Sequence, residues 1–233
     1  MKKVMIPVIA VLTLLFLNSF MMPDMPKEEV RKLDNFSGIG ISISADVYYT
    51  PGNAHEIRIE GDADDVEDLI TKVDNGFLQV KYPAGWKIRR SKLTLYITSS
   101  ELEAVKLSGS AKFNAEEAVT SDEMEFAVSG SGDINFKKLN TDEVGVKISG
   151  SGSINLESGN ADELVAKISG SGKLNAEAFE VDEFSAGISG SGGVRITVKD
   201  QLDAKISGSG KIYYHGTPRV NSTSSGSGKV VAL

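Results

Sequence analysis

Cysteine is absent from this 233-residue chain, and histidine occurs only twice, as His55 and His215. The absence of cysteine excludes disulfide bonds, thiolate metal sites and cysteine nucleophiles. Two histidines leave few groups for general-base catalysis or metal binding. Nucleic-acid binding requires a basic face, and the formal net charge of −7 does not suggest one. We therefore expect a protein that is not an enzyme, holds no cofactor and binds no nucleic acid.

The N-terminus has the pattern of a secretory signal. Lys2 and Lys3 precede an apolar run from Val4 to Leu17, which is shorter than the roughly 20 residues of a membrane-spanning helix. We interpret residues 1–19 as a signal peptide and the polar residues 20–35 as a linker, which predicts export to the periplasm or cell surface. The alternative is an uncleaved N-terminal anchor in the inner membrane, which would be the chain's only membrane contact.

The strongest signal is an internal repeat built around Ser-Gly-Ser-Gly, or Ser-Gly-Ser-Ala in the first copy. Its seven copies begin at Ser108, Ser129, Ser149, Ser169, Ser189, Ser207 and Ser225. Successive copies are 21, 20, 20, 20, 18 and 18 residues apart. With the first serine of each copy as position 0, apolar residues recur at −5, −3, −1 and +5, and usually at +7, which is the period of a β-strand.

A unit of this length with only strands and tight turns is typical of one coil of a parallel β-solenoid. The repeat lacks the Leu-x-x-Leu-x-Leu spacing of leucine-rich repeats, and it is shorter than the roughly 40 residues of a propeller blade, so both of these folds are excluded. We therefore predict an all-β, single-domain parallel β-helix, expected to be right-handed. Residues 101–233 would form its seven Ser-Gly coils.

Strand alternation predicts that both glycines of the tetrapeptide face inward and both serines face outward. A bent strand is the favoured interpretation, and the alternative is a corner with glycine at positive φ. Either way, the outward serines form a regular strip of hydroxyls, which is the candidate binding face. Its members are Ser129, Ser131, Ser149, Ser151, Ser169, Ser171, Ser189 and Ser191.

Position +6 is asparagine in four consecutive repeats: Asn114, Asn135, Asn155 and Asn175. Coils of a β-solenoid stack at the strand spacing of about 4.8 Å, so equivalent residues form columns. Stacked amides can hydrogen-bond along such a column. We interpret these residues as a structural ladder. No residues are predicted to ligate a metal.

Residues 36–100 lack the tetrapeptide and are predicted to form a mixed N-terminal cap. Within them, Ile41–Tyr49 aligns with Val128–Phe136 and is interpreted as a degenerate copy of the repeat. Val66, Leu69, Ile70 and Val73 follow the helical period, which predicts one short helix over residues 62–75. Such a cap would hide the unpaired edge of the first coil.

Several short segments of the chain match a known pattern. Phe36-Ser37-Gly38-Ile39, Ala45-Asp46-Val47 and Pro51-Gly52, followed by serial Ser-Gly-Ser-Gly coils, resemble the head GIN domain family. Its members are called auto-transporter adhesins and are common in Bacteroidetes-type bacteria. The resemblance covers residues 36–233 and implies a β-helix related to pectate-lyase-like folds and a role in cell adhesion. It supplies no catalytic residues to transfer.

Two functions stay open at this point. The first is an adhesion or binding module at the cell envelope that recognises a cell-surface glycan, a protein or another copy of itself through the serine columns. The second is a purely structural envelope protein without a specific ligand. The apolar segment Lys229–Leu233 adds an expectation of self-association, because an uncovered last coil would offer unpaired backbone groups.

Overall fold

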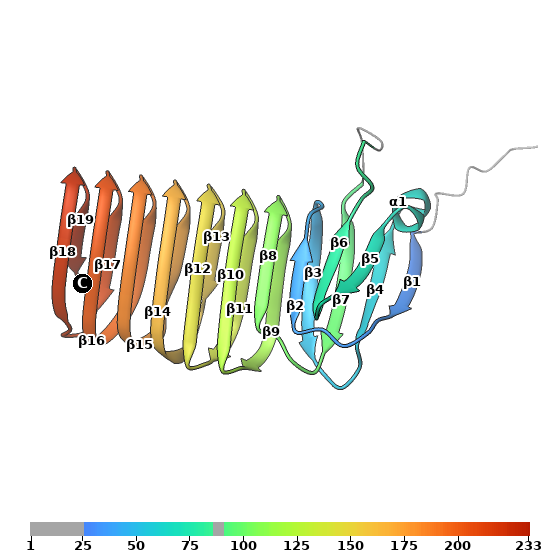
Figure 1. Ribbon diagram of the computed structural model, residues 1–233, viewed down its shortest axis with the longest axis horizontal. Helices are drawn as coiled ribbons and strands as arrows, with labels where there is room; N and C mark the ends of the chain where they lie inside the picture. The colour runs from blue at the N-terminus through green and yellow to red at the C-terminus, as the bar shows by residue number, and fades with distance from the viewer. Residues whose placement is uncertain (1–25, 86–90) are drawn as a thin grey trace, which may run out of the picture.

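The computed structural model describes residues 26–85 and 91–233, and over these residues the chain is a β-solenoid with one short helix, α1 (Ala63–Glu67) (Figure 1). The predicted fold class is confirmed. The proposed signal peptide, residues 1–19, lies outside the described residues. Within residues 26–85 and 91–233, no helix is long and apolar enough to cross a membrane.

The strands form two stacks that run the length of the solenoid. The first stack contains, in spatial order, β5 (Ile70–Asp74), β6 (Phe77–Lys81), β2 (Gly38–Ile41), β8 (Ala104–Gly109), β10 (Glu123–Gly130), β12 (Glu143–Gly150), the ends of β14 (Gly159–Gly170), β15 (Lys173–Gly190) and β16 (Gly193–Gly208), and β18 (Arg219–Gly226). From β6 onward its pairings are parallel, so equivalent residues of successive coils lie side by side (Figure 1).

The second stack follows the corner of each coil. It contains β1 (Lys27–Lys32), β4 (Glu56–Gly61), β7 (Leu93–Ser99), β3 (Ala45–Pro51), β9 (Lys112–Thr120), β11 (Asp133–Asn140), β13 (Ser153–Leu156), the starts of β15 and β16, β17 (Lys211–His215) and β19 (Lys229–Ala232). The later coils are shorter because β16 omits residues present in β15, where the pairing shifts between Ala176 and Glu180.

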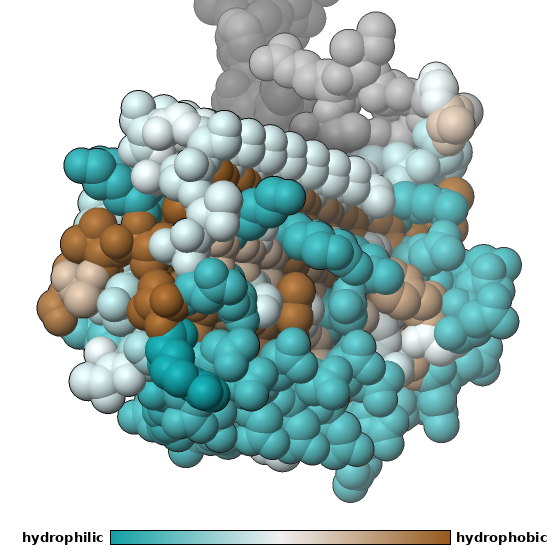
Figure 2. Space-filling model, turned by 60° about the vertical axis from the view of Figure 1, so that its left-hand side comes forward, coloured by the Kyte–Doolittle hydropathy of each residue, from teal (hydrophilic) through white to brown (hydrophobic). Residues whose placement is uncertain are grey.

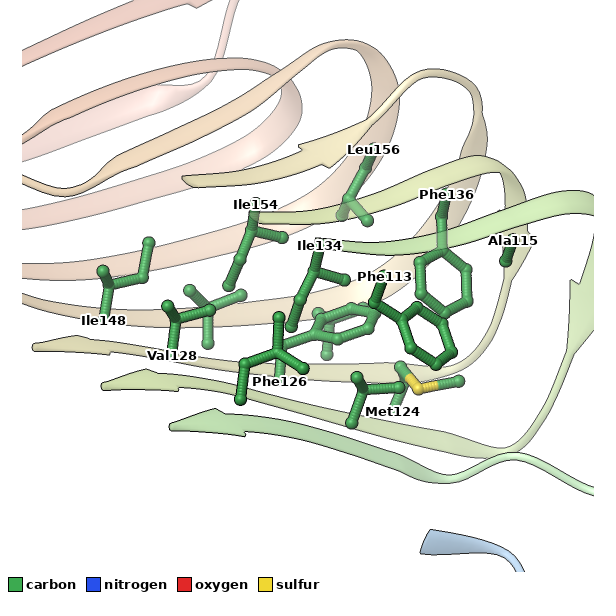
Figure 3. Close-up of a cluster of buried hydrophobic side chains, with 14 of the residues drawn as sticks. Phe113, Ala115, Met124, Phe126, Val128, Ile134, Phe136, Ile148, Ile154 and Leu156 are labelled. Atoms are coloured by element: carbon green, nitrogen blue, oxygen red, sulfur yellow. The ribbon is translucent and has the colours of Figure 1, made fainter. Parts of the chain in front are cut away.

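The interior is filled by the apolar positions that the repeat predicts. Met124, Phe126 and Val128 of β10 and Ile134 and Phe136 of β11 are buried, and Figure 3 shows them packed between the stacks. Aromatic rings stack along the axis where the cap meets the coils. The ring centroids of Tyr49 and Phe113 are 6.1 Å apart, and those of Phe113 and Phe136 are 5.9 Å apart. Burial of this continuous apolar column is the main stabilising contribution to the fold. The same burial raises the pKa of the Tyr49 hydroxyl.

Of the two interpretations of Ser-Gly-Ser-Gly, the corner is correct and the favoured bent strand is wrong. β10 ends at Gly130 and β11 begins at Asp133. The first glycine of every copy has a φ between 103° and 123°, which residues with a Cβ rarely adopt. This glycine is part-exposed and does not face inward. The second glycine, such as Gly132, is buried, as predicted, and both serines are exposed.

The degenerate copy predicted at Ile41–Tyr49 is confirmed. β2 pairs with β8 so that Ile41 lies beside Leu107, and β3 pairs with β9 so that Val47 lies beside Phe113. These are the positions −1 and +5 of the repeat. The solenoid therefore begins before the first tetrapeptide, inside the predicted cap.

The linker prediction is wrong for residues 27–32, which form β1 and pair antiparallel with β4. The Arg31 guanidinium anchors this strand by donating hydrogen bonds to the carbonyl oxygens of Leu69 and Val66, at 2.5 and 2.8 Å. A hydrogen bond from Arg31 lowers the pKa of Glu29 on the same strand. A strand with charged residues at a sheet edge discourages pairing with other chains, and its polar composition hid it from the hydrophobic pattern.

The predicted helix over residues 62–75 is too long. α1 ends at Glu67, and Asp62 caps it by accepting the backbone N–H of Asp64 at 3.1 Å. Asn75 and Gly76 have φ values of 50° and 73°, and they connect β5 to β6 as a two-residue hairpin. Asn-Gly is a strong hairpin signal, so the turn took precedence over the helical spacing of the apolar residues.

The coil that contains β18 and β19 is more polar than those before it. Ser222 and Ser224 occupy the inward positions that Ala204 and Ile206 have in the preceding coil. Association through the apolar segment Lys229–Leu233 stays a prediction.

The corner conformation generates a stability prediction. Gly170 has a φ of 103°, and a Cβ there would lie 2.7 Å from the Gly150 carbonyl oxygen. Gly170→Ala is expected to lower the free energy of unfolding by about 1–3 kcal/mol. Gly187 is the matched control, because a Cβ there meets nothing within 4 Å. Gly187→Ala is expected to leave the stability unchanged or raise it by up to about 1 kcal/mol. Denaturant unfolding of both variants measures the difference, and equal effects would contradict the corner's role.

Candidate functional site

The predicted serine face exists as two exposed columns along the corner edge of the solenoid. The first column contains Ser129, Ser149, Ser169 and Ser189, which are paired in register on β10, β12, β14 and β15. The second contains Ser131, Ser151, Ser171 and Ser191, which lie in the corners themselves. Figure 2 shows a straight, pale ridge of near-neutral residues along this edge. At the strand spacing, neighbouring serines of a column are about 4.8 Å apart.

The corner backbone is held by hydrogen bonds between coils, whereas the hydroxyls are available. The N–H of Ser151 donates to the Gly130 carbonyl at 2.9 Å, and that of Ser171 donates to the Gly150 carbonyl at 2.9 Å. Within residues 26–85 and 91–233, none of the eight hydroxyls is hydrogen-bonded to another side chain or to the backbone. The columns are therefore a rigid row of free donors and acceptors.

The four asparagines form one continuous chain of amide hydrogen bonds on the second stack. Asn135 donates from Nδ2 to Oδ1 of Asn114 at 3.0 Å. Asn155 donates to Asn135 and Asn175 donates to Asn155, both at 2.7 Å. Asn114 itself donates to the Val47 carbonyl at 3.1 Å, which ties the ladder to the cap. Since the amides satisfy one another, their arrangement is that of a structural element.

Two rows of lysines flank the serine columns, and the sequence reasoning did not single them out. Position −2 carries Lys106, Lys147, Lys167 and Lys205, and position +4 carries Lys112, Lys173, Lys211 and Lys229, all of them exposed. We call these the first and second lysine rows. Both rows could have been found by reading positions −2 and +4 of the repeat in the same way as the apolar positions.

The opposite edge of the solenoid is acidic. Glutamates at position −6 pair in register between coils, and an aspartate precedes each of them. The glutamates are Glu123, Glu143, Glu163 and Glu183, and the aspartates are Asp122, Asp142, Asp162 and Asp182. Like charges in register repel one another. One cation at this edge is Lys199, whose hydrogen bond with Asp182 raises its pKa. Lysines thus predominate beside the serine columns, and carboxylates predominate at the opposite edge, in a chain that is acidic as a whole.

Neither histidine contacts a serine of the columns. His55 Nε2 lies 3.3 Å from Ser100 Oγ, and its Nδ1 has no hydrogen-bond partner among the described residues. His215 ends β17 within the second stack and contacts Glu177 Oε1 at 3.2 Å. A serine becomes a nucleophile when an adjacent base takes its proton, and neither histidine is placed to do so for the serine face.

The comparisons with known proteins agree with this architecture. The family model described as "Putative auto-transporter adhesin, head GIN domain" matches residues 35–218. No curated protein matches the sequence. A Bacteroides fragilis structure described as a "putative adhesin" is 21% identical over 91% of this chain and 98% of its own, with a TM-score of 0.84.

Two Parabacteroides structures are also similar over most of their length. A "putative adhesin" from Parabacteroides merdae is 25% identical over 90% of this chain and 97% of its own, with a TM-score of 0.73. A "Putative lipid binding protein" from Parabacteroides distasonis is 22% identical over 90% of this chain and 97% of its own, also with a TM-score of 0.73. These likenesses show that the fold extends across the described solenoid.

The asparagine ladder generates a second stability prediction. Asn135→Ala removes an inner member, leaving the Asn114 oxygen without its donor and the Asn155 amide without its acceptor. We expect a loss of about 1–2 kcal/mol in the free energy of unfolding. Asn175→Ala removes an exposed end member and one hydrogen bond, so its cost should be at most about half as large. Thermal or denaturant unfolding compares the two, and an equal cost would show that the ladder does not act as a chain.

Proposed function

Because the chain belongs to the head GIN domain family, we propose that it is an exported, non-catalytic module that binds glycans at the cell envelope through its serine columns. Two structurally similar proteins each carry the description "putative adhesin", and adhesion requires a surface presented to an external partner. The serine columns are the best candidate for such a surface.

One observation carries the proposal: eight exposed hydroxyls stand in two straight, in-register columns and make no hydrogen bond within the described protein. A polysaccharide is itself a repeating row of hydroxyls, so it can exchange hydrogen bonds with successive coils. The corners fix the positions of the serines before a ligand arrives. Such preorganisation reduces the entropy that binding would otherwise cost.

The regular spacing also favours a polymer over a small molecule. A single sugar would meet only two or three hydroxyls on this open edge, and each hydrogen bond contributes about 1 kcal/mol net. A chain of sugars bound to several coils would sum these small contributions. The proposal contains no catalytic step, since neither histidine lies beside these serines in the described part of the chain.

A glycan array with a hydroxyl-deletion variant tests the function. The protein is expected to bind a subset of polysaccharides. Replacing Ser131, Ser151, Ser171 and Ser191 together with alanine should weaken that binding about tenfold or more, and the unfolding midpoint should change little because these side chains are exposed.

Ser185→Ala is the control, because Ser185 lies on the outer side of the first stack but outside both columns. This variant should bind like the wild type. An array without any bound glycan, or equal binding by the quadruple variant, would contradict the proposal.

Export is tested separately by N-terminal sequencing of the mature protein from its native host. We expect the mature chain to begin between about residues 19 and 26, because the basic start and the short apolar run are those of a cleaved signal. An intact Met1 in the soluble cytosolic fraction would contradict export.

A further inference from the structure

A groove of about 540 Å³ lies on the outer face of the first stack, where the cap meets the coils. It runs beside the first serine column and crosses β6, β2, β8, β10, β12 and β14. Four lysines and one aromatic ring line it: Lys81, Lys106, Lys147, Lys167 and Phe77. It is therefore a site in which hydroxyl, cationic and aromatic groups face the same space.

Small residues in the lysine row create the depth of the groove. Gly40 and Ala127 lie on either side of Lys106 in the parallel register, and Lys147 follows Ala127. At Gly40 and Ala127 the surface is therefore lower than on the neighbouring strands, whose lysine side chains project outward. A ligand can approach the backbone of β10 at Ala127 and still contact the ammonium groups of Lys106 and Lys147 on either side.

The Phe77 ring lies across the glycines of β2. A Cβ at Gly40 would come within 2.7 Å of the ring, so glycine is what allows the ring to lie there. The Lys106 ammonium group is 4.8 Å from the ring centroid, a cation–π distance. The ring is only half-buried, which leaves part of its surface for a ligand.

The lysines of the groove are poorly neutralised. Lys147 pairs with Glu125 at 3.4 Å, at the exposed surface. Lys81 donates a hydrogen bond to Gln79 at 3.0 Å, and neither Lys106 nor Lys167 forms an ion pair with any described residue. One carboxylate therefore faces four ammonium groups, in a chain whose net charge is −7. This local excess of positive charge selects an anion.

We propose that this groove binds an anionic sugar of a polysaccharide, one that carries a carboxylate or a sulfate. The inference rests on the proposed glycan-binding function and names its ligand class. Lys106, Lys147 and Lys167 bind the acidic group, and Phe77 packs against the apolar face of the sugar ring. The hydroxyls of the sugar exchange hydrogen bonds with the serines along one wall, Ser108, Ser129 and Ser149.

The arrangement favours an acidic polymer over an isolated anion. The first lysine row continues past the groove to Lys205, parallel to the serine columns. Successive acidic sugars of one chain can therefore meet ammonium groups and hydroxyls together. A free phosphate or sulfate would use the lysines alone, without the ring or the serine wall.

The test compares pairs of polymers that share a sugar backbone, one anionic and one neutral. Polygalacturonate is compared with its methyl ester, and dextran sulfate with dextran, by isothermal titration at physiological salt. We expect at least one of the two anionic polymers to bind at least tenfold more tightly than its neutral counterpart. Lys106→Gln and Lys147→Gln are each expected to weaken that binding about five- to tenfold.

Lys211→Gln is the matched control, because it removes the same charge from the second lysine row, outside the groove. Its affinity should change less than twofold. Phe77→Leu should weaken the binding of the polysaccharide severalfold and leave the binding of inorganic sulfate unchanged. Equal losses for all three lysine variants would reveal general polyanion attraction and overturn the site.

Two further outcomes separate this inference from the proposed function. Glycan binding that depends on the serine columns but shows no preference for acidic polymers would overturn the groove assignment and leave the function standing. If the protein binds phosphatidylserine vesicles more tightly than either acidic polymer, and this binding depends on Lys106, the ligand of the groove is a lipid headgroup. That result would overturn the assignment of an acidic sugar as the ligand. A protein that binds no glycan would overturn both.

Discussion

From Gly130 onward, the first glycine of each corner holds the solenoid in register, because its backbone conformation and its closeness to the preceding coil both exclude a side chain. At Gly170 the φ is 103°, and the carbonyl of Gly150 is within contact distance of any added Cβ. With the corner fixed, strand alternation determines the rest. Positions −1, −3 and −5 point inward, and positions 0 and −2 point outward. The serine columns and the first lysine row are therefore consequences of the same constraint that packs the core.

Because the coils stack in register, like charges at equivalent positions lie side by side and repel one another. In this chain such charges are concentrated at the two edges of the solenoid. Repeating a charged residue at one position places like charges on adjacent strands, which is unfavourable. The chain accepts this cost at both edges, with acidic pairs at position −6 and lysines at positions −2 and +4. Neutral residues such as Ala127 and Gly187 interrupt the first lysine row. The result is a solenoid with one basic, hydroxyl-rich edge and one acidic edge, an arrangement that core packing does not require.

Much of this architecture could be predicted from the sequence, because a repeat shows each structural position several times. The inward apolar residues and the outward serines followed from alternation, and the copy at Ile41–Tyr49 followed from its alignment with the repeat. The corner could not be predicted in this way. An inward-facing strand position and a turn with positive φ both favour glycine, so the sequence did not distinguish the two interpretations. β1 was missed because its partner β4 is distant in sequence and its own residues are mostly charged. The helix prediction failed where the Asn75-Gly76 hairpin outweighed apolar spacing.

The site was harder to predict than the fold, for a physical reason. Burial constrains inward residues strongly, so their pattern is clear, whereas an outward lysine is typical of any surface. The lysine rows become informative only once the register places them beside the serines. Phe77 is a further case. It lies in the cap, far in sequence from Lys147 and Lys167, and the solenoid brings all three to one groove.

The most direct test of this account is a crystal structure of the protein bound to a short oligomer of whichever acidic polysaccharide it binds more tightly. The account predicts that the sugar lies along the serine columns, with its carboxylate or sulfate within hydrogen-bond distance of Lys106 or Lys147 and a sugar ring against Phe77. An oligomer bound away from this edge, or a groove that stays empty at saturating oligomer, would contradict it.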